Sequence, residues 1–165
     1  MLPIVLDPSK AAVGLSGKGA ALSRRRDHLI EAGVTPIEID SDRPDGLIGL
    51  DLLYVAGADK AAAEALASRA RVLGILVNVE DIPALCDFHV PATVRRGDLL
   101  LTASSAGRAP GLVRLVREWL ATRFGPEWGG RVERIARERA RWRSRGLPPS
   151  EISRKTRALA DGWLA

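Results

Sequence analysis

Two short apolar runs of this sequence each end in polar side chains that could carry chemistry. The run Val72–Val77 ends in Asn78 and, three residues later, Asp81, and the run Leu99–Leu101 leads into Ser104-Ser105. If both runs are strands of an open α/β sheet, these groups stand at carboxyl ends of strands, where such sheets bind ligands. A partly desolvated carboxylate can accept a proton near neutral pH, so Asp81 is a predicted general base. The alternative is an aspartate that only caps the following turn.

A turn that contains two glycines stands between a predicted strand and a predicted helix near the N-terminus. In Gly17-Lys18-Gly19 the glycines would let backbone N–H groups at the start of the helix approach a pyrophosphate. A P-loop is excluded, because Ala12 occupies the position of its first glycine and Gly19 that of its hydroxyl residue. A plain strand–helix turn remains open.

Two aspartates, Asp40 and Asp42, follow the next predicted strand. They lie about where an acidic side chain meets a ribose hydroxyl in nucleotide-binding sheets. Either could instead begin the turn that Pro44 continues. With the glycine turn, they make the N-terminal half a predicted nucleotide-binding half.

Ser104 and Ser105 could contact an anion or act as nucleophiles. A nucleophilic serine needs an adjacent base. The chain has two histidines, His28 and His89, and no Gly-x-Ser-x-Gly motif, so hydrolase chemistry is disfavoured. The serines are predicted to cap the helix that begins near Pro110, or to line a pocket.

The elements that must position these groups follow from hydrophobic spacing. Strands alternate with helices in the N-terminal part, which indicates parallel βαβ units in a doubly wound α/β sheet. The predicted strands are Leu2–Leu6, which could instead be the entry to a strand, Lys10–Leu15, Thr35–Ile39, Leu50–Ala56, Val72–Val77 and Leu99–Leu101. The predicted helices are Ala20–Ala32 and Asp59–Ala70. Beyond Pro110, where all four tryptophans lie, the pattern predicts helices only, the last two over Val132–Arg145 and Glu151–Trp163.

Size and charge limit the class of protein. The 165 residues suffice for one domain, or one domain with a small helical extension. The net charge of +5 favours anionic partners, which include nucleic acid, phosphate-bearing cofactors and polycarboxylates. The arginine-rich helix Val132–Arg145 contains i,i+4 pairs such as Glu133–Arg137, which is typical of a solvated helix, so no nucleic-acid partner is expected.

The compartment follows from what the sequence lacks. No apolar run approaches the ~20 residues that a membrane-spanning helix needs, and the N-terminus has no signal-like pattern, so no membrane partner is expected. Cys86 is the single cysteine, which excludes an intrachain disulfide and zinc-ligand spacing, and no metal site is predicted. We expect a cytoplasmic protein of a bacterium-like cell.

Taken in order, these motifs resemble the siroheme synthase N-terminal family of precorrin-2 dehydrogenases, many of which are also sirohydrochlorin ferrochelatases. The similarity covers roughly the first three quarters of the chain, and its most specific part is Asn-x-x-Asp together with the Ser-Ser-x-Gly segment. The matching residues are Leu2-Pro3, Gly17, Gly19, Glu31-Ala32-Gly33, Asn78-Val79-Glu80-Asp81, Phe88, Pro91-Ala92, Arg96-Gly97, Ser104-Ser105, Gly107, Pro110 and Leu112–Arg117.

The resemblance implies three regions and a reaction. It implies an NAD-binding Rossmann-like domain with helices on both faces of its sheet over residues 1–103, a largely helical dimerisation region over 104–146, and a short C-terminal helical segment over 147–165. The protein would be a homodimer in which NAD⁺ accepts a hydride from the tetrapyrrole precorrin-2 to give sirohydrochlorin. In bifunctional members ferrous iron is then inserted. A polyanionic tetrapyrrole suits an arginine-rich chain.

The resemblance also assigns residues. Asp81 matches the aspartate proposed as proton acceptor in both steps. Ala20, Ala21, Ser41 and Asp42 fall on cofactor-contacting positions, and Ser105 on a serine of the tetrapyrrole pocket. The predicted cofactor set is therefore Gly17, Gly19, Ala20, Ala21, Asp40, Ser41, Asp42 and Asn78, and the predicted substrate set is Ser104, Ser105, Gly107 and Arg117.

The chain departs from the family pattern at two turns. The family's three-glycine turn reads Gly17-Lys18-Gly19 here, with Leu22 at the third small position. Its usual Ala-Ala-Thr reads Val55-Ala56-Gly57. These departures motivate an alternative hypothesis, a non-catalytic tetrapyrrole- or nucleotide-binding protein derived from the family.

Overall fold

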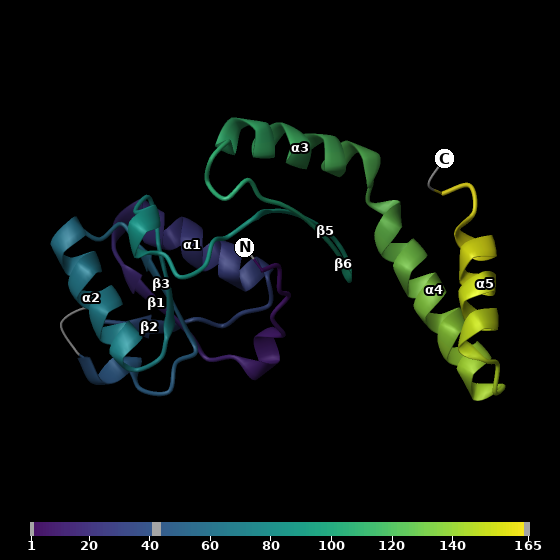
Figure 1. The fold of residues 1–165 in the computed structure, drawn as a ribbon, viewed down its shortest axis with the longest axis horizontal. Helices are drawn as coiled ribbons and strands as arrows, with labels where there is room; N and C mark the ends of the chain where they lie inside the picture. The colour runs from purple at the N-terminus through teal and green to yellow at the C-terminus, as the bar shows by residue number, and fades with distance from the viewer. Residues whose placement is uncertain (1, 41–43, 164–165) are drawn as a thin grey trace. The chain divides into compact units, whose positions relative to one another are not determined.

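The structure, a computed structural model, describes residues 2–40 and 44–163. These residues form two compact units, Met1–Val90 and Pro91–Ala165, each of which is described by itself (Figure 1). Two residues of the predicted cofactor set, Ser41 and Asp42, lie outside the described residues.

The first unit is built on a parallel sheet with the strand order β2-β1-β3-β4. The strands are β1 (Val13–Gly17), β2 (Ile37–Ile39), β3 (Leu52–Ala56) and β4 (Leu76–Val79), and the helices are α1 (Gly19–Glu31) and α2 (Lys60–Val72). All pairings are parallel, so the carboxyl ends of the four strands share one edge. The predicted α/β class with a parallel sheet is confirmed.

The two helices cover opposite faces of this sheet, because side chains alternate along each strand. On one face, Leu53 and Val55 of β3 pack against Leu66 and other apolar residues of α2. On the other face, Leu15 of β1 packs with Leu29 of α1. The core therefore fixes both helices, and with them the turns that precede each helix.

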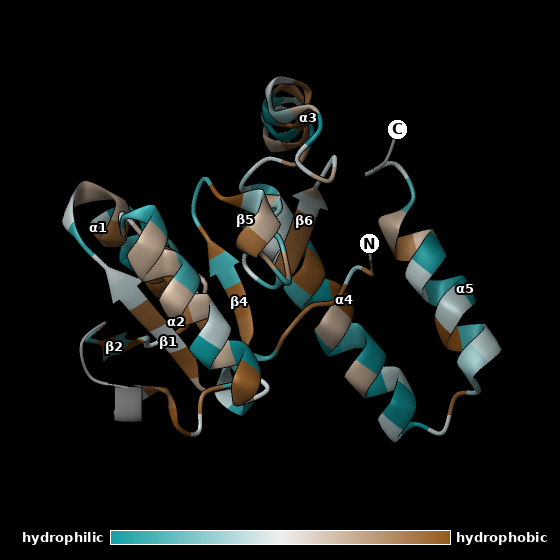
Figure 2. Cartoon of the chain, turned by 60° about the vertical axis from the view of Figure 1, so that its left-hand side comes forward, coloured by the Kyte–Doolittle hydropathy of each residue, from teal (hydrophilic) through white to brown (hydrophobic). Residues whose placement is uncertain are grey.

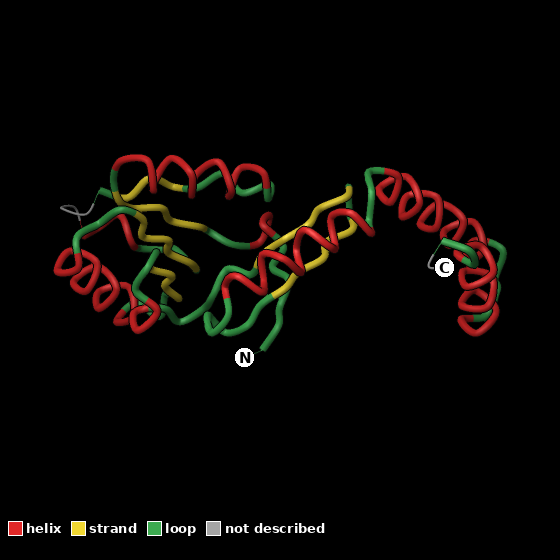
Figure 3. Tube along the Cα trace, turned by 90° about the horizontal axis from the view of Figure 1, so that it is seen from above, coloured by secondary structure: helices red, strands yellow, loops and turns green. Residues whose placement is uncertain are grey.

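The second unit begins with an antiparallel hairpin of β5 (Ala92–Arg96) and β6 (Leu99–Ala103). Helix α3 (Pro110–Arg123) runs along both strands of the hairpin (Figure 3). The Arg96 side chain ties the hairpin to the end of α3, donating to the carbonyl oxygens of Ala121 at 3.0 Å and Phe124 at 2.7 Å. Helices α4 (Glu127–Ser144) and α5 (Pro149–Ala160) then pack against each other.

Two local predictions were wrong, and one strand was missed. Leu2–Leu6 forms no strand, and its side chains are exposed, because no neighbouring strand pairs with it. The apolar run Val72–Val77 is divided by Gly74, whose φ of 76° ends α2 at Val72, so that β4 starts only at Leu76. The strand β5 was not predicted, since its two arginines interrupt the apolar pattern.

The hairpin also bears on the division of the chain. The first domain boundary was predicted after residue 103, whereas the two compact units of the structure divide between Val90 and Pro91. Strand β6 pairs with β5 and packs on α3 rather than joining the parallel sheet, so it belongs with the helices that follow.

Across residues 2–40 and 44–163, no helix combines the length and the apolar character that crossing a bilayer requires.

Candidate functional site

The carboxyl ends of β1 and β3 form the switch point of the parallel sheet. From β1 the chain moves outward to β2 and then crosses back to β3 on the other side of β1. Doubly wound sheets bind dinucleotides at this point. Strand β1 ends there at Gly17, and α1 begins at Gly19. The predicted glycine turn therefore lies where the topology places a nucleotide site.

Two glycines bring the turns after β1 and β3 into backbone contact. Gly17 has a φ of 138°, and a Cβ at this position would overlap the carbonyl oxygen of Ala56. That oxygen accepts a hydrogen bond from the Lys18 N–H at 3.1 Å. Gly57 has a φ of 71°, and a Cβ there would overlap the Lys18 carbonyl oxygen. Only glycine fits either position.

Gly57 was not identified from the sequence as a residue of this site and was noted only as a departure from the family pattern. The available signal was a glycine directly after a buried strand and two residues before Asp59, the N-cap of α2. Its left-handed backbone lets the two turns lie against each other, which explains why a threonine cannot stand there in this chain.

The start of α1 is open on the side where a ligand would approach. Nothing lies within 4 Å of the position that a Cβ on Gly19 would occupy. Ala20 is exposed, Ala21 is half-buried, and Lys18 makes no capping hydrogen bond through its side chain. Asp40, exposed, directly follows β2, the strand next to β1. These residues fit a dinucleotide, because the backbone N–H groups at an uncapped helix start can donate hydrogen bonds to phosphate oxygens.

The carboxyl end of β4 carries the predicted general base. Figure 2 shows a polar band near the carboxyl end of this otherwise apolar strand, whose sequence is Leu-Val-Asn-Val. Asp81 was expected from the sequence to be partly desolvated, but this residue is exposed. Its φ of 62° lies in the left-handed region that non-glycine residues seldom adopt. It sits in a turn that the Ile82 N–H closes onto the Val79 carbonyl oxygen at 3.4 Å. Strained backbone of this kind clusters at functional sites.

Asn78, in the predicted cofactor set, is buried and faces a different group. Its side-chain amide donates to the Phe88 carbonyl oxygen at 2.9 Å. In the sheet register it lies beside Tyr54 of β3. The Asn78 side chain therefore binds the segment that follows the turn and holds that segment against β4.

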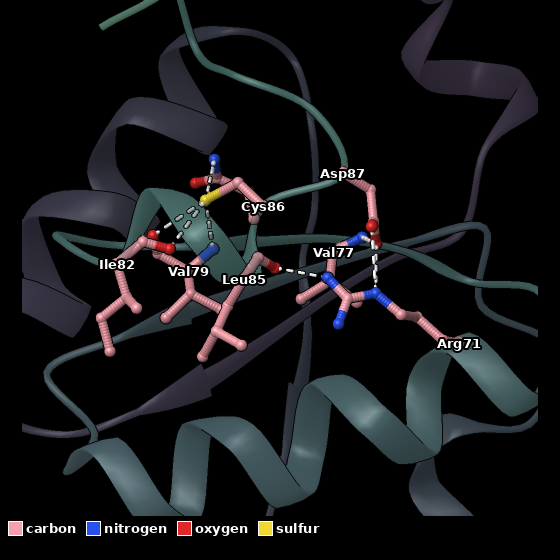
Figure 4. A network of polar contacts seen from close by, with 8 residues as sticks. Arg71, Val77, Val79, Ile82, Leu85, Cys86 and Asp87 are labelled. Atoms are coloured by element: carbon pink, nitrogen blue, oxygen red, sulfur yellow. Dashed lines mark hydrogen bonds and ion pairs between the residues drawn. The ribbon is translucent and has the colours of Figure 1, made fainter.

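This following segment, residues 85–88, is bound along the free edge of β4 by a polar network (Figure 4). The Asp87 N–H donates to the Val77 carbonyl oxygen at 2.7 Å, and the Asp87 carboxylate accepts from the Val77 N–H at 3.0 Å. Arg71 of α2 donates to the same carboxylate at 3.0 Å and to the Leu85 carbonyl oxygen at 2.8 Å. Sequence reasoning singled out neither Arg71 nor Asp87, because no local pattern links them.

Arginines of α1 reach the ends of β3 and β4 on the other face of the sheet. Arg24 lies 3.9 Å from the carboxylate of Glu80, the residue before Asp81. The Arg25 guanidinium stands over the Tyr54 ring, 5.5 Å from its centre, and Phe88 meets the same ring edge-on at 5.3 Å. This cluster covers the sheet between α1 and the residue 85–88 segment.

Tyr54 gives a pH prediction, because burial raises the pKa of its phenol above 10 while Arg25 partly offsets the rise. A raised pKa means that the folded protein holds the phenol proton more tightly than the unfolded chain does. Stability is therefore unaffected while the pH is below the pKa of Tyr54 in the unfolded chain, and it falls as the pH rises above that pKa. Tyr54 is the single tyrosine, so tyrosinate absorbance reports it alone. We expect the titration midpoint of Tyr54 to lie above that of the urea-unfolded chain, and equal midpoints would contradict the partial burial of the ring.

The predicted substrate residues belong to the second unit. Ser104 accepts from the Ala106 N–H at 3.4 Å, and Ser105 accepts from the Ala109 N–H at 3.0 Å. Gly107, with a φ of 74°, lets the chain turn into α3. The Arg117 side chain donates to the Thr93 carbonyl oxygen at 3.2 Å and so ties α3 to β5. The predicted capping role was wrong, because Ala109 is the N-cap of α3 and no side chain caps this helix. The two serines instead accept hydrogen bonds within the turn that precedes α3.

Within the described part of the chain, no three His, Cys, Asp or Glu side chains gather in a group that could hold a metal ion.

Comparison with known proteins places this geometry in context. Residues 34–92 match the protein family described as "Putative NAD(P)-binding". Siroheme synthase of Thiobacillus denitrificans is 38% identical over 104 residues, which are 63% of this chain and 22% of that protein. Siroheme synthase of Pseudomonas aeruginosa strain LESB58 is 38% identical over 129 residues, which are 78% of this chain and 27% of that protein. The siroheme synthase of Photorhabdus laumondii is 32% identical and matches 87% of this chain and 34% of its own length.

The chain thus spans about a quarter of the length of the first two relatives. A solved structure titled "SirC, precorrin-2 dehydrogenase" superposes with a TM-score of 0.74 and covers 99% of this chain and 92% of its own. The two sequences are 17% identical, so this likeness shows a shared fold.

Proposed function

We propose, on the premise that the chain belongs to the siroheme synthase N-terminal family, that it is an NAD-dependent precorrin-2 dehydrogenase of siroheme biosynthesis. It would oxidise precorrin-2 to sirohydrochlorin. The observation that carries the proposal is the pairing, on one sheet edge, of an open glycine turn at the switch point with an exposed carboxylate, Asp81, at the end of β4.

The cofactor would be held by the main chain at the start of α1. Gly17, Gly19, Ala20 and Ala21 surround the uncapped N–H groups there, and Asp40 follows the neighbouring strand at the position of a ribose-binding carboxylate. Ser41 and Asp42 complete the proposed cofactor set, whereas Asn78, which the sequence also assigned to it, is buried and acts through its hydrogen bond to Phe88. NAD⁺, when bound, supplies the acceptor for the hydride.

Asp81 would take the proton that the oxidation releases. Precorrin-2 loses two hydrogens, one as hydride and one as a proton, and the products are sirohydrochlorin, NADH and H⁺. A carboxylate on a fixed turn meets the geometric requirement of a general base, since it is exposed and its backbone is held.

The charge distribution supports a polycarboxylate substrate. The second unit has 16 Lys+Arg against 7 Asp+Glu, whereas the first has 9 against 13. A tetrapyrrole that carries many carboxylates is attracted to a surface of this sign. We propose that Ser104, Ser105, Gly107 and Arg117, at the start of α3 and along it, belong to the substrate-binding face of this basic unit.

The direct test is a turnover assay of the purified chain with NAD⁺ and precorrin-2. We expect NADH to form together with the absorption spectrum of sirohydrochlorin. The non-catalytic alternative, a tetrapyrrole- or nucleotide-binding protein, predicts neither product. Calorimetric titration with NAD⁺ separates the cases further, since a chain that binds no cofactor at millimolar concentration cannot be the dehydrogenase.

Ferrochelatase activity is a second proposed step. It needs a base that removes pyrrole N–H protons while ferrous iron enters as a substrate, and Asp81 is the exposed carboxylate that would serve. Addition of ferrous iron to the product of the first assay should give the siroheme spectrum. An unchanged sirohydrochlorin spectrum would limit the chain to dehydrogenation.

We also propose a homodimer that uses the apolar side of α3. Leu112, Leu115, Val116 and Trp119 recur at helical spacing on one side of the helix. Trp119 is 63% exposed and Leu115 62%, so the second unit by itself leaves this stripe uncovered. An exposed stripe of this composition marks an interface.

The double substitution Leu115→Arg with Trp119→Arg is expected to weaken dimerisation roughly 30-fold or more, because large central apolar side chains dominate interface energies. Light scattering after size exclusion measures the mass. Arg114→Ala, on the opposite side of α3, removes an exposed ion pair with Glu118 and should leave the mass unchanged. A wild-type chain that runs as a monomer at high concentration would contradict the proposal.

A cytoplasmic location completes the proposal. Cys86 is a free thiol, which a reducing compartment preserves. Cell fractionation would test it.

A further inference from the structure

The turn that presents Asp81 is unusual in how it is held. Its backbone places a non-glycine residue at a φ of 62°, a conformation that persists only when surrounding contacts fix it. The closing hydrogen bond of the turn, from the Ile82 N–H to the Val79 carbonyl oxygen, is long at 3.4 Å. The side chain of Asp81 is exposed and therefore cannot be fixed by packing. Something other than the turn itself must hold it.

The Cys86 thiol contacts both ends of this turn (Figure 4). Its sulfur accepts from the Val79 N–H at 3.3 Å, and the thiol lies within donating distance of the Val79 carbonyl oxygen at 3.1 Å and the Ile82 carbonyl oxygen at 3.5 Å. Each bond to sulfur is weak, but together they join the first and last residues of the turn. Cys86 is half-buried and packs at the margin of the core that β3, β4 and α2 share.

Cys86 is itself held from both sides. After Cys86, the Arg71–Asp87 ion pair at 3.0 Å fixes the next residue, and the Asn78 amide donates to the Phe88 carbonyl oxygen one position further on. The Leu85 N–H donates to the Ile82 carbonyl oxygen at 2.9 Å. The thiol is thus a fixed point beside the turn, and its position is set by β4 and α2 rather than by Asp81.

We propose that Cys86 is a positioning residue for the dehydrogenase, whose thiol holds the Val79–Ile82 turn so that the Asp81 carboxylate stays in place for proton transfer. This inference rests on the proposed function of Asp81. It assigns to Cys86 a role that depends on hydrogen bonding and not on redox or metal chemistry.

The test is the pair Cys86→Ala and Cys86→Ser. Loss of the sulfur frees the turn, so Cys86→Ala is expected to lower kcat roughly 10- to 100-fold with the Kd for NAD⁺ unchanged. A serine hydroxyl can both donate and accept, so Cys86→Ser should recover kcat to within about threefold of the wild type. Amide hydrogen exchange at Ile82 should speed up in Cys86→Ala and return toward wild type in Cys86→Ser.

Val13→Ala is the matched control, since Val13 is 3% exposed and lies at the opposite end of β1 from the proposed site. It should lower Tm at least as much as Cys86→Ala and leave kcat unchanged. Equal losses of kcat in both variants would overturn the positioning role, because general instability would explain them.

Asp81→Asn, assayed in parallel, separates the inference from the function on which it rests. Full activity of Cys86→Ala beside an inactive Asp81→Asn would overturn the positioning role alone. If Asp81→Asn were fully active, the proposed proton acceptor would fall, and with it the catalytic meaning of Cys86. An unchanged rate of amide hydrogen exchange at Ile82 in Cys86→Ala would show that the thiol does not hold the Val79–Ile82 turn, whatever the result for Asp81→Asn.

Discussion

Asp81→Asn is expected to lower kcat for NADH formation by about 10²- to 10⁴-fold, the usual contribution of a general base. Asparagine cannot accept the proton that precorrin-2 releases, but it matches aspartate in size. It also tolerates the left-handed backbone of this turn, so the fold should be kept. Initial rates of NADH formation measure the effect, and thermal unfolding confirms that the protein stays folded.

The matched control is Glu80→Gln, a loss of one negative charge at the adjacent residue. Glu80 faces Arg24 at 3.9 Å on the α1 side of the sheet, and its removal should change the rate little. If Glu80→Gln and Asp81→Asn had the same modest effect, Asp81 would contribute only to the general electrostatic field. A fully active Asp81→Asn would remove the mechanism proposed for this protein.

Gly17→Ala is expected to destabilise the fold by roughly 4 kcal/mol or more, the range reached when a substitution meets both backbone strain and overlap. Its Cβ would overlap the Ala56 carbonyl oxygen, so β1 and β3 would have to separate at the switch point. The Lys18–Ala56 hydrogen bond would be lost with that movement. Urea unfolding measures the loss, and low soluble yield is the expected outcome at 37 °C for a small domain.

Gly19→Ala provides the comparison in the same turn. Gly19 also has a positive φ, 67°, but no atom lies within 4 Å of the added Cβ. Only the left-handed backbone is penalised, at about 1–2 kcal/mol. If the two variants unfolded at the same urea concentration, backbone conformation and not the contact with Ala56 would require glycine at position 17. If Gly17→Ala is insoluble, Gly57→Ala is the variant to measure in its place. Its Cβ would overlap the Lys18 carbonyl oxygen, so we expect a similar loss of stability.

Much of the parallel sheet could be predicted from the sequence because its signals are local. Buried strands such as Leu52–Ala56 are continuous apolar runs, and α2 shows both an alanine-rich pattern and an aspartate at its N-cap. The glycine turn, Asp40 and Asp81 stand directly after strands, so their place at the carboxyl edge follows once the strands are parallel. Leu2–Leu6 was wrongly predicted as a strand because apolar character alone does not show whether a partner strand exists. The start of the strand in Val72–Val77 was wrong because the run also contains the end of α2 and Gly74.

The order of a nucleotide-binding half and a helical, arginine-rich part can be read from the residues, because strand and helix patterns and side-chain charge are local properties of the chain. The need for glycine at position 57 follows only from the folded chain, since the carbonyl oxygen that Gly57 approaches belongs to Lys18, thirty-nine positions earlier. The support that Cys86 and Arg71 give the Asp81 turn likewise follows only from the folded chain, because hydrogen bonds to main-chain atoms leave no residue pattern to read. The residues proposed to perform chemistry can be identified in the sequence, while those proposed to hold them in place can be identified only when the strands are assembled.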